Sequence, residues 1–222
     1  MDEAPLKHID ADAEHRKRIE YALKIWGQAV EFRGTIAETY LRHRHTEVSA
    51  RVVDLRFHPR CVAGEGRRVP AMVALMRNII TNEPRAIHRT FIKSDGTGKD
   101  DLVGACPKGR KFLGPSEGAM IKLADDADVT LGLGIAEGVE NALTWAAAGW
   151  WPIWAAPDVE HVKKFPVLDG IETLTIFADN KKADDVEAAR ECAIRWSAAG
   201  KRVEILKPRE GTDWNDIGRE IA

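Results

Sequence analysis

The sequence has few cysteines, and they follow no recognisable pattern. Cys61, Cys106 and Cys192 are widely spaced, and they form neither a CxxC pair nor a Cys/His pattern of the zinc-binding kind. An odd and scattered set of this kind argues against a disulfide scaffold, and it equally argues against a zinc ribbon among these residues. We therefore expect buried free thiols at all three positions.

Long apolar runs and a strong net charge are also missing. No apolar run approaches the length of a membrane span, and Met1 to Ala4 lack the basic and then apolar start of a signal peptide. We therefore expect a cytoplasmic protein with no membrane partner. The formal net charge of −2 gives no overall attraction to nucleic acid, so any such binding must come from local basic patches.

The first half of the chain is predicted to be a small α+β segment, covering residues 1–125. Apolar residues recur at helical spacing from about 11 to 32, and Thr35 with Glu38 has the form of a capping box that opens a second helix ending near His43. We expect these two helices to form a hairpin. A small antiparallel sheet is predicted to follow, with strands at 55–57 (ending at Pro59), 71–77, 86–93 and 119–123.

The second half, residues 126–222, alternates strand and helix. The predicted strands are 130–136, 152–156, 173–178 and 202–206, and the predicted helices are 139–148, 158–164 and 183–199. Alternating elements of this length imply a parallel sheet with right-handed crossovers, flanked by helices. The predicted fold class is therefore α/β, preceded by the smaller α+β segment.

Two predicted strands of the second half end in an acidic residue. Glu137 and Gly138 follow the run from Thr130 to Ala136, and Asp179 follows the run from Thr173 to Ala178. Side chains at the carboxyl ends of neighbouring parallel strands converge on one crevice, and two carboxylates there would make an oxygen site suited to Mg²⁺ or Mn²⁺. From the pattern alone, a capping carboxylate at Glu137 and a polar strand end at Asp179 remain as alternatives.

Three stretches of this half resemble the motifs of the Toprim domain. They are Glu137-Gly-Val-Glu-Asn-Ala, the acidic strand end Asp179-Asn180, and Gly211-Thr-Asp-Trp-Asn-Asp216. Toprim is the metal-binding module of bacterial-type primases, topoisomerases and some nucleases. The chain resembles in particular the Toprim-containing primase-like proteins of phages, plasmids and integrated elements. That likeness extends upstream through GTIAETYLRHR, LRFHP, PAMVAL, IHRTF and KFLGP. It implies a primase core that lacks the zinc-binding and helicase domains.

The resemblance also implies roles for individual residues. Glu137 matches a glutamate that acts as general acid or base, and Asp179 matches a Mg²⁺ ligand. The metal-linked residues under this interpretation are Glu137, Asp179, Asp184 and Asp213. Asp213, with Asn215 and Asp216, belongs to the closing motif, for which a helix cap is the alternative. Glu140 either supports the site or is a solvated acid in the first turn of a helix. The implied cofactor is Mg²⁺ or Mn²⁺, and the implied partners are single-stranded DNA, nucleotides and a replicative helicase.

One position departs from the family pattern, which has Asp-x-Asp at the second acidic strand end. Here the chain reads Asp179-Asn180-Lys181. Unit charges about 4 Å apart interact by roughly 4 kcal/mol at an effective dielectric near 20, and a divalent ion facing Lys181 would feel about twice that as repulsion. Three outcomes stay open. Asp184 or Asp185 supplies the missing carboxylate, Lys181 itself contacts phosphate, or the site is inactive while still binding nucleic acid.

Several basic residues are candidates for binding template phosphates or an incoming nucleotide. They are Arg56, His88, Arg89, Lys108, Lys111 and Lys181. Basic side chains beside a metal site suit that role, and a solvated sheet face is the equal alternative. The predicted function is Mg²⁺-dependent primer synthesis on single-stranded DNA in the replication of a mobile element. A Toprim nuclease and a catalytically inert nucleic-acid-binding module are the alternatives.

Overall fold

The computed structural model describes residues 4–44, 46, 48–64, 66–100, 109–209, 212 and 214, with the side chains of all of these except 4–12 and 110. The helices are α1 (Ala4–Gln28), α2 (Ile36–His43), the 3₁₀ helix η1 (Asp126–Asp128), α3 (Val139–Ala147), α4 (Val159–Lys163) and α5 (Ala183–Ala198). The strands are β1 (Val30–Glu31), β2 (Leu55–Gly64), β3 (Arg67–Asn78), β4 (Pro84–Phe91), β5 (Arg110–Leu113), β6 (Ala119–Met120), β7 (Gly132–Glu137), β8 (Ile153–Ala156), β9 (Thr173–Phe177) and β10 (Arg202–Leu206).

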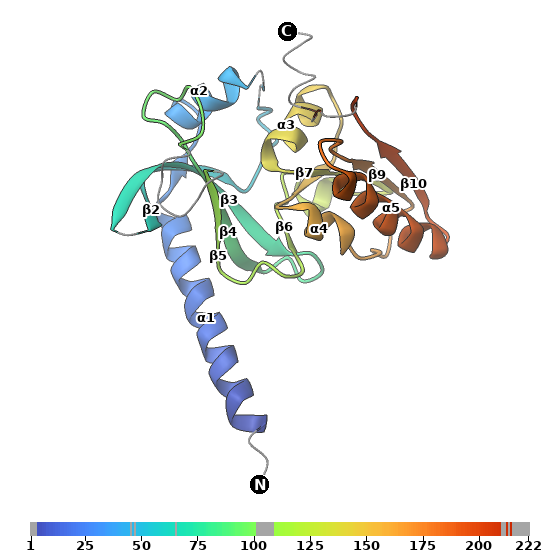
Figure 1. Ribbon diagram of the computed structural model, residues 1–222, viewed down its shortest axis with the longest axis horizontal. Helices are drawn as coiled ribbons and strands as arrows, with labels where there is room; N and C mark the ends of the chain where they lie inside the picture. The colour runs from blue at the N-terminus through green and yellow to red at the C-terminus, as the bar shows by residue number, and fades with distance from the viewer. Residues whose placement is uncertain are drawn as a thin grey trace.

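The first sheet is antiparallel, with the strand order β1-β2-β3-β4-β5 and with β6 paired to β3. Side chains alternate along its central strand. Val73 and Leu75 pack in the same cluster as Ile25 of α1, whereas Met72 packs in the cluster that contains Leu41 of α2. The two helices therefore cover opposite faces of this sheet, and Figure 1 shows them on its two sides.

Two expectations for the first half are wrong. The helices do not form a hairpin, because α1 ends at Gln28 and the short strand β1 pairs with β2 before α2 begins on the other face. Strand β2 does not end at Pro59 but continues to Gly64. A shift in register between His58 and Cys61 accommodates the proline, which has no N–H to donate to a regular ladder.

The second sheet is parallel, with the order β10-β9-β7-β8, as the alternating pattern predicts. Its strands and the three helices that flank it begin and end within two residues of their predicted bounds. Helix α3 packs on the face turned toward the first sheet, through Leu143. Helices α4 and α5 pack on the other face, through Val162 and Trp196. The predicted fold class is thereby confirmed (Figure 1).

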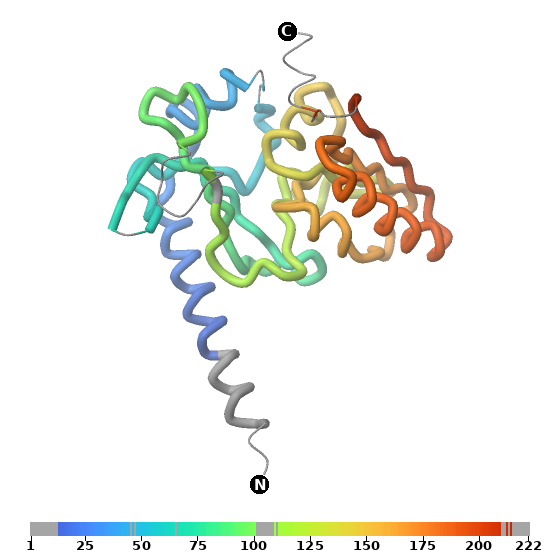
Figure 2. Tube along the Cα trace, viewed as in Figure 1, coloured from blue at the N-terminus to red at the C-terminus, as the bar shows by residue number. Residues whose placement is uncertain are grey.

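Each sheet is built from one continuous stretch of the chain, as the path of the tube in Figure 2 shows. The two stretches nevertheless share a hydrophobic core, because Met72 of β3 belongs to the same buried cluster as Leu143 of α3. The connection after β6 reinforces it, since Ile121 bridges to Ala155 of β8. The edges of the two halves are therefore held in fixed positions next to each other.

The two described cysteines agree with the expectation of buried free thiols. Cys61 and Cys192 are buried free thiols, and Cys106 lies outside the residues that the structure describes. Burial raises the pKa of the Cys192 thiol to about 11, so this group is inert near neutral pH. Within the described part of the chain, no helix combines the length and the apolar character needed to cross a membrane.

A histidine links the two halves away from the strand ends. His161 of α4 has its Nδ1 2.6 Å from Asp158 Oδ1 and its Nε2 2.8 Å from the carbonyl oxygen of Ser116, which lies between β5 and β6. Burial by itself lowers the pKa of His161, but these two acceptors outweigh burial and hold the pKa above its usual value. An imidazolium donates from both nitrogens, so the protonated form suits both acceptors.

We expect the stabilising effect of His161 to decrease as the pH rises. Because its folded-state pKa is raised, the contribution is fully present below the unfolded value of 6.5 and is lost as the pH passes through the folded value. The variant His161→Asn should therefore cost on the order of 1 kcal/mol near pH 6 and less near pH 9. Urea unfolding of both proteins at both pH values measures the difference, and an equal cost at the two would contradict the prediction.

Candidate active site

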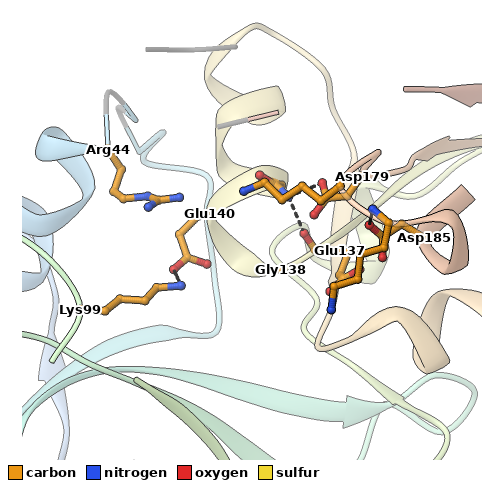
Figure 3. A pocket seen from close by; sticks show the side chains of 10 residues that line it. Arg44, Lys99, Glu137, Gly138, Glu140, Asp179 and Asp185 are labelled. Atoms are coloured by element: carbon orange, nitrogen blue, oxygen red, sulfur yellow. Dashed lines mark hydrogen bonds and ion pairs between the residues drawn. The ribbon is translucent and has the colours of Figure 1, made fainter. Parts of the chain in front are cut away.

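The carboxyl ends of β7 and β9 open into a pocket of about 450 Å³. Glu137 is the last residue of β7, and Asp179 comes two residues after the end of β9; both line the pocket. The parallel pairing places Ala136 opposite Phe177, so the two strands end at the same level. The two strand-end carboxylates therefore lie in one pocket, as Figure 3 shows.

Asn141 joins the two strand ends. Its Nδ2 donates to Asp179 Oδ1 at 2.7 Å and to the Glu137 carbonyl oxygen at 2.9 Å. Gly138 makes this contact possible, because its φ of 82° is in the region that favours glycine and turns the chain from β7 directly into α3. The sequence motif contains Asn141, but its role emerges only from a contact with a residue 38 positions away.

Glu140, one residue earlier in α3, is buried between the two halves. Its Oε1 accepts a hydrogen bond from the Tyr40 hydroxyl at 2.7 Å and pairs with Lys99 Nζ at 2.8 Å. Burial by itself would raise the pKa of Glu140, but the Lys99 ammonium, the Tyr40 hydroxyl and Arg44 together hold it far below its usual value. The alternative of a solvated first-turn acid is thereby corrected, because the side chain points away from solvent toward Lys99 and Arg44 (Figure 3).

Both halves of the chain supply charged side chains to the pocket. Arg44 and Lys99 come from the antiparallel half, and Lys181 and Lys182 come from the loop between β9 and α5. In the described part of the chain, the lining contains four basic residues (Arg44, Lys99, Lys181 and Lys182) and four acidic residues (Glu137, Glu140, Asp179 and Asp185), so the formal charges of these residues sum to zero. The pocket therefore offers oxygen atoms to a cation and N–H donors to an anion.

The two acids at the start of α5 have different positions. Asp185 lines the pocket, and its Oδ2 accepts a hydrogen bond from the backbone N–H of Lys182 at 2.9 Å, which helps to cap α5. Asp184 instead lines a separate hollow beside Arg190 and Lys207. Of the two acids named as possible replacements for the missing carboxylate, the structure brings Asp185 and not Asp184 to the strand ends.

The last described residues return to the same end of the sheet. Asn180 donates from Nδ2 to the carbonyl oxygen of Pro208 at 2.9 Å. Its backbone N–H donates to the carbonyl oxygen of Thr212 at 3.2 Å. The ring of Trp214 packs edge-on against that of Trp145, with centroids 4.7 Å apart. The predicted site residues Asp213, Asn215 and Asp216 lie outside the described residues, and so does Lys108.

The other predicted basic residues are spread over the first half. Arg56 lines a different hollow, beside α1. His88 and Arg89 are buried, because both faces of β4 are covered, and Lys111 is exposed on β5. Of the described members of the set, Lys181 alone lines the pocket. The basic side chains that the first half does supply to the pocket are Arg44 and Lys99, which the sequence analysis did not identify.

The donor atoms of the pocket suit a hard divalent cation. Glu137 and Asp179 offer carboxylate oxygens at adjacent strand ends. Across the described ranges, no group of three or more His, Cys, Asp and Glu side chains is arranged to hold a metal ion. Mg²⁺ is commonly bound through only one or two carboxylates together with waters and substrate phosphates, so two carboxylates fit this cation.

Two family models match adjoining parts of the chain. Residues 132–221 match the Toprim domain, and residues 16–123 match a domain of unknown function (DUF7146). No curated protein matches the sequence. The Toprim match covers the strand ends that carry Glu137 and Asp179, and members of this domain family typically bind a divalent metal.

Solved structures of primases resemble the whole arrangement. The DnaG primase catalytic domain bound to single-stranded DNA has a TM-score of 0.58 at 14% identity, over 94% of this chain and 78% of that one. The DnaG catalytic core has a TM-score of 0.56 at 13% identity, and the match covers 93% of this chain and 74% of that core. The Aquifex aeolicus primase, a structure that contains the zinc-binding and RNA polymerase domains, has a TM-score of 0.56 at 12% identity. That match covers 93% of this chain and 58% of the primase chain. The C-terminal part of this chain therefore matches the Toprim domain, and the chain has the fold of DnaG primase catalytic cores.

Proposed function

We propose that this protein is a primase-like nucleotidyltransferase that synthesises RNA primers on single-stranded DNA with Mg²⁺ or Mn²⁺. One observation carries the proposal: Glu137 and Asp179 share a pocket with Arg44 and Lys99, so both halves of a primase-type fold contribute to it. Nucleotidyl transfer needs such a combination, because the reaction develops negative charge on phosphate oxygens and moves a proton from the attacking hydroxyl.

The residues of the pocket would have different roles in the reaction. Glu137 would act as the general base for the attacking hydroxyl or as the acid for the leaving group. Asp179, oriented by Asn141, would hold the divalent metal together with Glu137. The metal, when bound, supplies positive charge that stabilises phosphate oxygens. Arg44, together with Lys181, would face the nucleotide phosphates from the two sides of the pocket.

The proposed partners are a single-stranded DNA template, ribonucleotides and a replicative helicase, and the proposed setting is the cytoplasmic replication of a mobile element. The resemblance to DnaG cores supports the template, since one of those cores is bound to single-stranded DNA. A second candidate, a nucleic-acid-binding module without activity, is favoured by a specific observation: Lys181 lines the pocket where a carboxylate is usual in the family.

An incubation with single-stranded DNA, labelled ribonucleoside triphosphates and Mg²⁺ or Mn²⁺ tests the proposal. We expect labelled products that require the DNA template, resolved on a denaturing gel. A parallel reaction with labelled DNA and no nucleotides detects cutting. Shortened DNA in that control would support a nuclease, whereas intact DNA with no products but measurable DNA binding would support the inactive module.

A further inference from the structure

The loop after β9 brings one carboxylate and one ammonium group to the pocket. Asp179 lines the pocket, and Lys181 lines it two residues later. Asp184 lines a separate hollow, and Asp185 uses an oxygen to accept the Lys182 backbone N–H at 2.9 Å. This loop therefore supplies positive charge at the place where a second cation would need a further carboxylate.

The helix α3 does not compensate for the missing carboxylate. Its first turn carries Asn141, whose amide nitrogen lies 2.7 Å from Asp179 Oδ1 and presents N–H groups to this oxygen. The same turn carries Glu140, whose Oε1 is held by Lys99 at 2.8 Å and by Tyr40 at 2.7 Å. The Asn141 nitrogen that faces Asp179 cannot ligate a cation, and the Glu140 carboxylate, which is engaged by the Lys99 ammonium group, is poorly placed to do so.

The balance of charge in the pocket also argues against a second cation. Among the residues that the structure describes, four acidic and four basic side chains line it, so their formal charges already balance before any cation enters. One divalent cation can be offset by the phosphates of a nucleotide. A second cation at the Lys181 side would meet an ammonium group in a partly enclosed space, where like charges repel more strongly than in bulk water.

We propose that this pocket binds a single divalent cation through Glu137 and Asp179, and that the Lys181 ammonium group takes the place of a second one. The inference rests on the proposed function, because it concerns the same pocket. It states, in addition, that the number of bound ions is determined by the residue at position 181. The structural basis is the position of Lys181, Asn141 and Asp185 around Asp179.

The binding of Mn²⁺ without nucleotide tests this number directly. Electron paramagnetic resonance of free Mn²⁺ during a titration, together with calorimetry, counts the bound ions in the purified 222-residue chain. We expect one ion that is lost in Asp179→Ala, and two ions in Lys181→Asp. The variant Lys207→Asp makes the same change of charge at a lysine that lines the separate hollow and should keep the count at one. Lys181→Met should also keep one ion, bound up to about tenfold more tightly.

Two ions in the wild-type protein that depend on Asp179 would overturn the inference. A count of one in Lys181→Asp, with a circular dichroism spectrum and melting temperature like those of the wild type, would overturn the role of Lys181. Binding that is unchanged by Asp179→Ala would overturn the assignment of the ligands. The count does not depend on catalysis, so one ion without primer synthesis would leave this inference intact and refute the proposed function.

Discussion

The variant Glu140→Gln should lower the free energy of unfolding by about 3–5 kcal/mol. The carboxylate of Glu140 is buried, and Lys99 Nζ lies 2.8 Å from it. Replacing the carboxylate with a neutral amide of the same size leaves the Lys99 ammonium group partly buried without its counter-charge. Removing one partner of a buried ion pair costs far more than the pair contributes in total, because the remaining charge is no longer compensated.

Two further variants, compared with the wild type and Glu140→Gln, separate this charge effect from simple loss of packing. The double variant Glu140→Gln/Lys99→Met removes both charges and should recover most of the loss. Tyr40→Phe removes only the hydrogen bond at 2.7 Å and should cost about 1 kcal/mol. Urea unfolding at neutral pH gives all four free energies. If the double variant were as unstable as Glu140→Gln, uncompensated charge would not be the cause.

The pH dependence of the same variant has a definite sign. The pKa of Glu140 is lowered by folding, so its contribution is present above the unfolded value of 4.5 and decreases as the pH falls below that value. The difference in unfolding free energy between the wild type and Glu140→Gln should therefore be constant near neutral pH and become smaller in acid. Because Glu140 connects α3 with α2 and the loop after β4, acid should weaken the contact between the two halves first.

Sequence periodicity predicts the parallel half well because its rules are local. Each buried strand of the second half is a short apolar run, each helix has an apolar stripe, and the chain order alone determines that Glu137 and Asp179 leave the sheet at the same end. In the first half the same periodicity identifies α1 and α2 but not the faces that they cover. Those faces depend on the register of β3, whose alternate side chains meet different helices.

The parts of the site that could not be predicted depend on contacts between distant residues. Tyr40 and Glu140 are 100 positions apart, and no local pattern relates them. The choice between Asp184 and Asp185 has a different origin. Adjacent residues on a helix are rotated by about 100° around its axis, so neighbouring acids face different directions. The sequence predicts the start of α5 at residue 183 correctly, but which acid faces the pocket depends on how α5 packs on the sheet, which the sequence alone does not define.

The variant Glu137→Gln should reduce primer synthesis by about 10²–10⁴-fold, which is the range for loss of a general acid or base. The amide has the same shape as the carboxylate, and Asn141 contacts Glu137 through its backbone carbonyl, so the fold around β7 should be preserved. The carboxylate that would accept a proton is lost, while Asp179 and Lys181 remain. Product formation should therefore fall much more than the affinity for single-stranded DNA, which fluorescence anisotropy measures independently.

A matched control makes this prediction specific to the pocket. Asp184→Asn is the same chemical change at an acid that lines a separate hollow, so primer synthesis should stay within about twofold of the wild type. An equal loss in both variants would mean that the general charge of this end of the sheet matters, rather than the position of Glu137. Wild-type activity in Glu137→Gln would remove Glu137 from the chemistry, leaving Asp179 as the carboxylate on which any remaining mechanism must depend.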